Sequence, residues 1–155
     1  MKTKLATIAI ILGGLSLATF ARAQGSLEGA WQLQERMVSG GDNEGTNTDP
    51  TLHRLLFTEG HYSRILNFTA RPDLLPEGES ATDELRLASY ATFRANSGTY
   101  EVSGSKLMLH FNLALNPAAV GNMTEAEYRI EGDNLITTVT DDEGVVTRDT
   151  YTRLD

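Results

Sequence analysis

Cysteine is absent from the chain, and its absence excludes several classes of protein at once. No disulfide can form, so the stability of the fold must come from its core. A thiol nucleophile and a thiolate metal site are excluded as well. A lipid anchor of the bacterial lipoprotein type, which is attached through a cysteine, is excluded for the same reason.

A membrane-spanning hydrophobic segment is also lacking at the N terminus. The uncharged run over residues 5–20 has sixteen residues, whereas a spanning helix needs about 20. Lys2 and Lys4 precede the run, and small residues at Ala21 and Ala23 follow it. This layout predicts a signal peptide over residues 1–23 that is removed before Gln24, rather than a retained anchor. Lysines, not paired arginines, precede the run, which argues against twin-arginine export. We expect a periplasmic or secreted protein without a stable membrane anchor.

Basic residues are in deficit. The chain has 13 Lys and Arg against 21 Asp and Glu, a net charge of −8, and removal of residues 1–23 makes it −11. Nucleic acid and anionic lipid surfaces would repel so acidic a protein. The remaining 132 residues, 24–155, are enough for one domain with a core.

The hydrophobic pattern after Gln24 has a period of two, which is typical of strands. Gly-, Asn- and Asp-rich turns separate the alternating segments. Residues 39–50 and 71–78 read as loops. A short helix is expected over residues 80–94, with Ser80 as its N-cap and Asp83 as a capping-box acid. The expected strands cover residues 30–38, 52–58, 61–68, 100–102, 107–115, 127–131, 135–140 and 145–154.

About eight strands with short turns favour an all-β fold, an antiparallel up-and-down barrel with one short helix, over a sandwich. Three stretches resemble bacterial lipocalin-like domain proteins of the calycin group. They are Gly29-Ala30-Trp31, residues 96–104, and the spaced set Asn116-Pro117, Gly121, Tyr128 and Glu131-Gly132-Asp133, with looser matches at Phe57-Thr58, Gly60, Tyr62-Ser63 and Arg71-Pro72.

The resemblance implies a small barrel with an internal cavity and no particular ligand. It also implies that Trp31, near the start of the first strand, meets Arg153, near the end of the last one, where the barrel closes. Two departures from the family pattern limit what the resemblance implies about function. Many relatives have a histidine pair where this chain has only His110, and some have an arginine where it has Ala126.

Candidate catalytic arrangements are scarce. The three histidines, His53, His61 and His110, have no metal-ligand spacing, and no phosphate-binding loop or glycine-flanked serine is present. The acids of residues 83–84 and 141–143 lie in polar segments where solvation explains them, and the latter lack the alternation of a calcium loop. We therefore expect no catalytic residue, metal or cofactor.

Inward side chains are the better candidates for binding, since small barrels hold ligands inside. Strict alternation places Glu35 on the face of Trp31, Leu33 and Met37, and His53 on the face of Leu55 and Phe57, whereas His110 points outward. A buried polar group needs a partner. The predicted ligand-binding residues are Glu35, His53, Phe57, Tyr100, Phe111 and Tyr128, within an inward set that adds Leu33, Met37, Leu55, Val102, Leu109, Ala126 and Thr137.

Three hypotheses follow. The first is an exported lipocalin-like barrel that binds a small hydrophobic molecule. The second is an enzyme, an isomerase, cyclase or hydrolase of a lipophilic metabolite, using His53 with Glu35 or Tyr128. The third is a fully packed barrel that serves as a protein-interaction module. The size of the internal cavity discriminates between them, and the sequence determines neither the ligand nor the oligomeric state.

Overall fold

A computed structural model describes residues 26–50, 52–67 and 80–154 of the chain. The predicted signal peptide and the predicted loop over residues 71–78 lie outside them. The strands are β1 (Gly29–Ser39), β2 (Gly45–Asn47), β3 (His53–Thr58), β4 (His61–Asn67), β5 (Phe93–Ser103), β6 (Lys106–Ala114), β7 (Met123–Glu131), β8 (Asn134–Thr140) and β9 (Val146–Leu154). They are joined by helix α1 (Asp83–Ala91) and the short 3-10 helix η1 (Pro117–Ala119).

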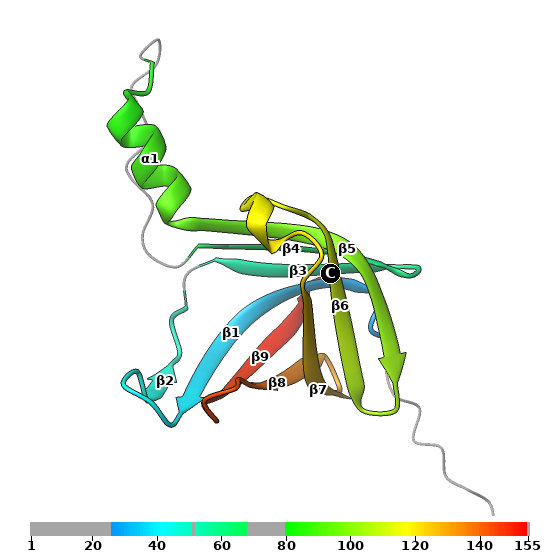
Figure 1. Ribbon diagram of the computed structural model, residues 1–155. Coiled ribbons are helices and arrows are strands. Elements are labelled where there is room, and N and C mark those ends of the chain that lie inside the picture. The colour runs from blue at the N-terminus through cyan, green and yellow to red at the C-terminus, as the bar shows by residue number, and fades with distance from the viewer. Residues whose placement is uncertain (1–25, 51, 68–79, 155) are drawn as a thin grey trace, which may run out of the picture.

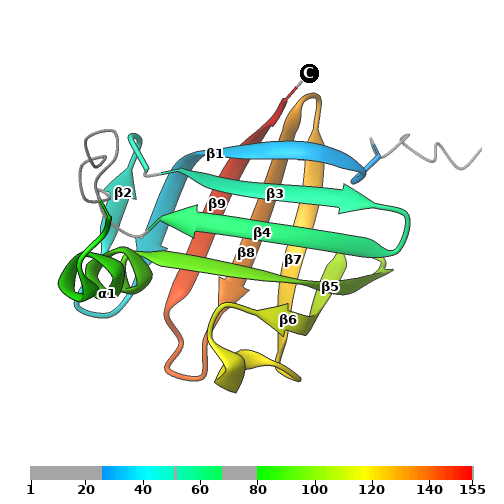
Figure 2. The same ribbon diagram turned by 90° about the horizontal axis from the view of Figure 1, so that it is seen from above.

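The sheet closes on itself as an antiparallel barrel. Each strand from β3 to β9 pairs with its neighbour in the chain, and β9 returns to pair with β1. The eight-stranded wall consists of β1 and of β3 to β9. The three-residue β2 pairs with residues 36–38 near the end of β1. Figures 1 and 2 show this wall from the side and from above, with α1 projecting from one end. The predicted up-and-down barrel with one short helix is confirmed.

The core fills one half of the barrel. Strict alternation on β3 buries every second side chain, and the buried residues of the other strands meet them inside. Trp31 and Leu135 are fully buried, and Tyr100 and Phe111 pack against the cluster from its edge. The core cluster consists of Leu27, Trp31, Leu33, Leu55, Phe57, Tyr62, Leu107, Leu109, Tyr128, Leu135 and Tyr151.

Two β-bulges break the alternation that the sequence suggests. On β1 the register shifts between Leu33 and Glu35, so that Arg36, not Glu35, pairs with the buried Asp149. On β6 the residue opposite changes from Leu113 to Phe111 as β5 passes from Ser97 to Gly98. An extra residue in one strand turns every later side chain to the other face. The inward placement of Met37 and Glu35 was therefore wrong.

The bulge on β6 has the same effect on the expected strand over residues 107–115, whose odd-numbered hydrophobic residues strict alternation places on one face. Leu107, Leu109 and Phe111 follow the expected inward face, but Leu113 is 67% exposed beyond the bulge. Val102 was also expected inside and is 46% exposed, because it lies at the end of β5 beside the Gly104 turn. Ala126 and Thr137 are buried as predicted.

Helix α1 is shorter than predicted, and β5 is longer. Thr82, not Ser80, is the N-cap: its side-chain oxygen accepts a hydrogen bond from the backbone N–H of Leu85 at 3.3 Å. The helix ends at Ala91, and β5 begins at Phe93, where the sequence predicted helix to residue 94. Residues 96–98 have little strand propensity, yet pairing with β4 on one side and β6 on the other holds them in the sheet.

The barrel closes where Trp31 meets Arg153, as the resemblance implied. The two residues pair across β1 and β9, and the Arg153 guanidinium lies 4.0 Å from the centre of the indole ring. The indole N–H donates to the Leu27 carbonyl oxygen at 2.8 Å, and Arg153 donates to the carbonyl oxygens of Ser26 and Glu28. These contacts fasten the segment that enters β1 onto the end of β9.

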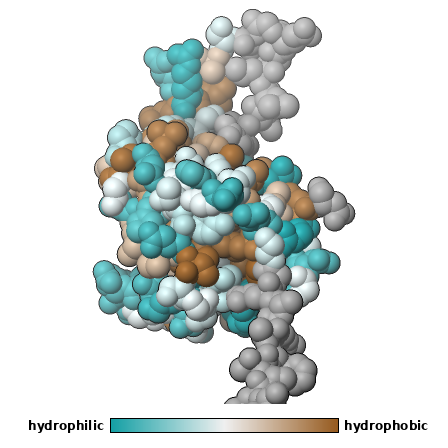
Figure 3. Space-filling model, turned by 90° about the vertical axis from the view of Figure 1, so that its right-hand side faces the viewer, coloured by the Kyte–Doolittle hydropathy of each residue, from teal (hydrophilic) through white to brown (hydrophobic). Residues whose placement is uncertain are grey.

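The surface is mixed in character. Figure 3 views the side that lies to the right in Figure 1, where hydrophobic patches interrupt a largely hydrophilic and neutral surface. In the part of the chain that the structure describes, no helix has the length and hydrophobicity to cross a membrane.

Candidate functional site

A pocket of about 330 Å³ lies at the end of the barrel that α1 adjoins. It is bounded by the first residue of β3, the end of β4, the start of β5 and the end of β6. It extends from the buried His53 to the exposed Arg94 and Asn116, so it reaches the surface. The lining residues are Arg36, His53, Arg64, Leu66, Arg94, Ala95, Asn96, Phe111, Ala114, Asn116 and Ala119.

His53 forms the deep wall of this pocket. His53 is the first residue of β3, and its side chain lies on the same inward face as those of Leu55 and Phe57. It is only 3% exposed. Its Nδ1 lies 3.5 Å from the Tyr151 hydroxyl oxygen, and the two rings meet edge to face. Its Nε2 is buried and has no hydrogen-bond partner among the described residues. A buried polar atom without a hydrogen-bond partner calls for an explanation, and here it belongs to a residue that lines a pocket.

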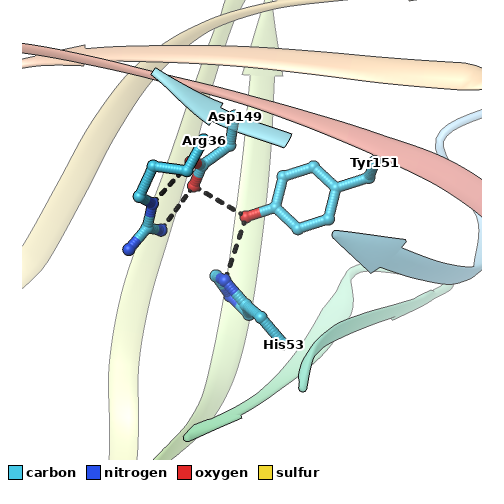
Figure 4. Close-up of polar contacts among 4 residues, drawn as sticks. All are labelled: Arg36, His53, Asp149 and Tyr151. Atoms are coloured by element: carbon cyan, nitrogen blue, oxygen red, sulfur yellow. Dashed lines mark hydrogen bonds and ion pairs between the residues drawn. The ribbon is translucent and has the colours of Figure 1, made fainter. Parts of the chain in front are cut away.

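A chain of polar contacts supports His53 from behind. The Tyr151 hydroxyl donates to Asp149 Oδ2 at 3.1 Å. Arg36 donates to both oxygens of the same carboxylate, each at 2.7 Å. Figure 4 shows the tyrosine hydroxyl between the carboxylate and the imidazole ring. This arrangement fixes the positions of Arg36 and His53, because a bidentate pair and a buried hydroxyl leave little rotational freedom.

Burial and the Asp149 carboxylate together determine the protonation states of His53, Tyr151 and Arg36. Desolvation lowers the pKa of His53 to about 3; the Asp149 carboxylate opposes this shift, and the charges of Arg64 and Arg36 reinforce it. Desolvation also raises the pKa of Tyr151 well above its usual range, with Asp149 adding to the shift. The hydrogen bond to Asp149 raises the pKa of Arg36. At neutral pH the imidazole is therefore uncharged and Arg36 is a cation.

Arg64 brings a second cation to the pocket wall. It alternates on β4 with the buried Tyr62 and Leu66, so its side chain points inward. The guanidinium carbon lies 5.6 Å from the centre of the Phe111 ring. Its Nε is buried without a hydrogen-bond partner, and Arg64 forms no ion pair within the described part of the chain. An N–H group in this state lowers stability unless an acceptor reaches it.

Two of the six predicted ligand-binding residues, His53 and Phe111, line the pocket. Three others lie in the packed half. Phe57 is almost fully buried and meets Tyr100 edge to face, with ring centres 5.2 Å apart, and Tyr128 is buried in the same cluster. These aromatic rings fill space rather than border it, and none of the three lines the pocket.

Glu35, the sixth predicted residue, lies on the outer side of β1. It pairs with Thr150, which alternates with the buried Asp149 and Tyr151 on β9. The bulge after Leu33 therefore directs Glu35 away from the interior and Arg36 toward it. Neither Glu35 nor Tyr128 is the partner of His53; that partner is Tyr151.

Several lining residues were not predicted. Arg64 carried a readable signal, since an arginine falls between Tyr62 and Leu66 on the alternating face of β4. Arg36 carried none, because only the bulge turns it inward. Asn96 accepts a hydrogen bond from the Tyr62 hydroxyl at 3.0 Å, and Asn116 accepts one from the Ala118 backbone N–H at 3.1 Å. These two amides are placed by pairing and capping that a period-two pattern does not reveal.

A second hollow of about 340 Å³ lies on the outside of the wall formed by β4, β5 and β6. Ile65 and the exposed Leu113 are among its lining residues. Among all the residues that the structure describes, those of both hollows included, no three or more His, Asp or Glu side chains gather closely enough to hold a metal ion. The inner pocket is thus the one with convergent buried polar atoms.

Comparison with known proteins gives no family. No protein-family model matches the chain, and no curated protein matches it. An uncharacterized protein from Bacteroides eggerthii is 12% identical, with a TM-score of 0.47 over 83% of this chain and 100% of its own. A redesigned beta barrel is 10% identical, with a TM-score of 0.44 over 83% of this chain and 92% of its own.

Proposed function

We propose that the protein is an exported, lipocalin-like barrel that binds a small molecule in the pocket beside His53. The observation that carries this proposal is that two residues lining the pocket, His53 and Arg64, each have a buried side-chain nitrogen, Nε2 and Nε respectively, without a hydrogen-bond partner among the described residues. Apolar walls with a few fixed polar groups are the usual composition of a ligand site.

The size of the pocket supports binding over a fully packed interaction module. A volume of about 330 Å³ corresponds to roughly ten molecules of liquid water, at about 30 Å³ each. The opposite half of the barrel is filled by Trp31, Phe57 and Leu135, so the packing of this fold is tight where no ligand is needed.

The Asp149–Tyr151–His53 contacts are the observation relevant to an enzyme, because a hydrogen-bonded relay can orient a general base. A general base works best with a pKa near the operating pH. A pKa of about 3 makes His53 a weak proton acceptor. Tyr151, with a raised pKa and full burial, is not a nucleophile at neutral pH. These values favour binding over catalysis.

The test uses protein purified from its native host. Native mass spectrometry should detect a bound small molecule on a chain that begins at Gln24. After removal of that molecule, the neutral fluorophore N-phenylnaphthylamine should bind. Ala119→Phe, at a position that lines only the inner pocket, should weaken binding of the probe, whereas Leu113→Phe, at a position that lines only the outer hollow, should not. An empty native protein that also fails to bind the probe would refute the proposal.

A further inference from the structure

Positive charge gathers in the pocket although the chain is acidic. Arg36, Arg64 and Arg94 line it in a protein with a net charge of −8. No aspartate or glutamate is found among its described lining residues, and Asp149 lies behind Arg36 as its partner. Cations exposed to a pocket in an acidic protein favour an anionic ligand over a neutral one.

Arg64 has the geometry of an anion-binding group. Its guanidinium lies over Phe111, and its buried Nε has no acceptor among the described residues. The Nε edge of a guanidinium presents two parallel N–H groups, which match the two oxygens of a carboxylate. Binding of an oxyanion here would satisfy the N–H group that is otherwise left buried.

His53 can supply a further donor to the same anion. The Tyr151 hydroxyl lies within reach of both Asp149 and His53 Nδ1. Rotation of this hydroxyl from Asp149 toward Nδ1 leaves the carboxylate with its two hydrogen bonds from Arg36 and allows the tautomer of His53 that carries its proton on Nε2. In that tautomer the Nε2–H group of this pocket-lining residue can donate to an oxyanion without any change in the charge of the imidazole.

The remaining walls accept an apolar body. Leu66, Ala95, Phe111 and Ala114 border the pocket between the buried and exposed ends. A ligand whose head group contacts Arg64 would therefore place hydrophobic atoms against these side chains and bury them from water.

We propose that the pocket takes a monocarboxylate with an apolar body, its carboxylate bound by Arg64 and its body packed against Phe111 and Leu66. This inference rests on the proposed function and names the ligand class of that site. A single charge is favoured because Asp149 already neutralises Arg36 and Arg94 lies at the exposed mouth of the pocket, which leaves Arg64 as the cation beside its buried end. A dianion such as a phosphate monoester would introduce a second charge, and burying an unpaired charge is costly.

The experiment compares three probes that share one alkyl chain: octanoate, octanamide and octyl phosphate. Calorimetry gives their affinities, and NMR locates binding through the resonances of Phe111 and His53. Octanoate should bind most tightly. Arg64→Gln should weaken octanoate binding by about 10- to 100-fold, because charge-assisted hydrogen bonds are lost, and leave octanamide binding unchanged. Arg64→Lys should recover part of the loss. Arg54→Gln, on the exposed face of β3, is the matched control and should have no effect.

The outcomes separate this inference from the function on which it rests. If octanamide binds as tightly as octanoate, the pocket still binds ligands but the carboxylate assignment fails. If octyl phosphate binds more tightly than octanoate, a phosphate head group replaces the carboxylate and the assignment fails again. If no probe perturbs Phe111 or His53, and N-phenylnaphthylamine does not bind either, the proposed function fails together with the inference. Unchanged octanoate binding in Arg64→Gln would overturn the role of Arg64.

Discussion

Individual side chains give this barrel its chemical character at the residue scale. Its packed half contains aliphatic and aromatic residues, whereas the pocket half contains a guanidinium stacked on Phe111 and an imidazole beside a buried tyrosine. The charge of Arg36 is balanced within the described chain and that of Arg64 is not. A structural role explains the first arginine, since it orders Asp149 and Tyr151. The second arginine, Arg64, lacks a hydrogen-bond acceptor for its Nε among the described residues, and a ligand would supply that acceptor.

The buried imidazole should make stability depend on pH. The folded-state pKa of His53 is about 3, below its usual value of 6.5. The unfolded chain therefore binds the extra proton between these two values, and stability falls as the pH decreases from about 6.5 toward 3. Between about pH 7.5 and pH 5 the His53 contribution amounts to roughly 2 kcal/mol in favour of the unfolded state.

Replacement by a neutral side chain should remove this part of the pH dependence. His53→Gln should show a smaller loss of unfolding free energy than the wild type between the two pH values, measured by urea denaturation. His61→Gln, at an exposed position, serves as the control and should retain the wild-type profile. An NMR titration that places the His53 pKa near 6.5 would contradict the prediction.

At the scale of the secondary-structure elements, bulges on β1 and β6 determine which side chains line the pocket. The irregularity on β1 brings Arg36 inside, and the one on β6 brings Ala114 to the pocket while turning Leu113 out. Gly98 permits the second bulge. A Cβ atom there would lie 1.8 Å from the His110 carbonyl oxygen and 2.9 Å from the Asn112 backbone nitrogen. The close approach of these strands therefore excludes any larger residue.

Gly98→Ala should consequently disrupt the β5–β6 hairpin beside the pocket. Overpacking against backbone costs about 1–3 kcal/mol or more, because neither clashing atom can rotate away. Gly104→Asn in the turn of the same hairpin is the control, since Asn tolerates a positive φ and nothing lies within 4 Å of the added Cβ atom. Thermal unfolding compares the two variants. Equal melting temperatures for Gly98→Ala and the wild type would show that the strands can separate without cost.

Closure of the barrel is the feature that matters at the scale of the whole molecule. β1 pairs with β3 along its first residues and with β9 along nearly its whole length, so one strand joins both ends of the sheet. Trp31 and Arg153 lie at this seam, remote in sequence but stacked in space. Because closure removes the exposed edges of an open sheet, contacts at the seam stabilise all eight strands together.

Removal of the indole should therefore destabilise the entire barrel. Trp31→Ala should lower the free energy of unfolding by about 3–5 kcal/mol, as expected for a fully buried aromatic residue. Arg153→Met retains the apolar stem and should cost less, about 0.5–2 kcal/mol for the lost cation–π contact plus the hydrogen bonds to Ser26 and Glu28. Urea denaturation measures both. Arg129→Met, at an exposed ion pair on β7, is the control. A Trp31→Ala variant as stable as the wild type would exclude a role in closure.

The sequence by itself determined the strands, the turns between them and the closed barrel, because alternation and turn residues are local properties of the chain. It also placed His53 and Phe111 on the inward face of their strands, and both line the pocket. Only the tertiary structure decided which half of the barrel is filled and which is hollow. It placed Arg36 inside and Glu35 outside, because a bulge forms through pairing with a distant strand and leaves no mark in the local pattern. Pairing on both sides likewise extended β5 through residues whose own propensity opposes a strand.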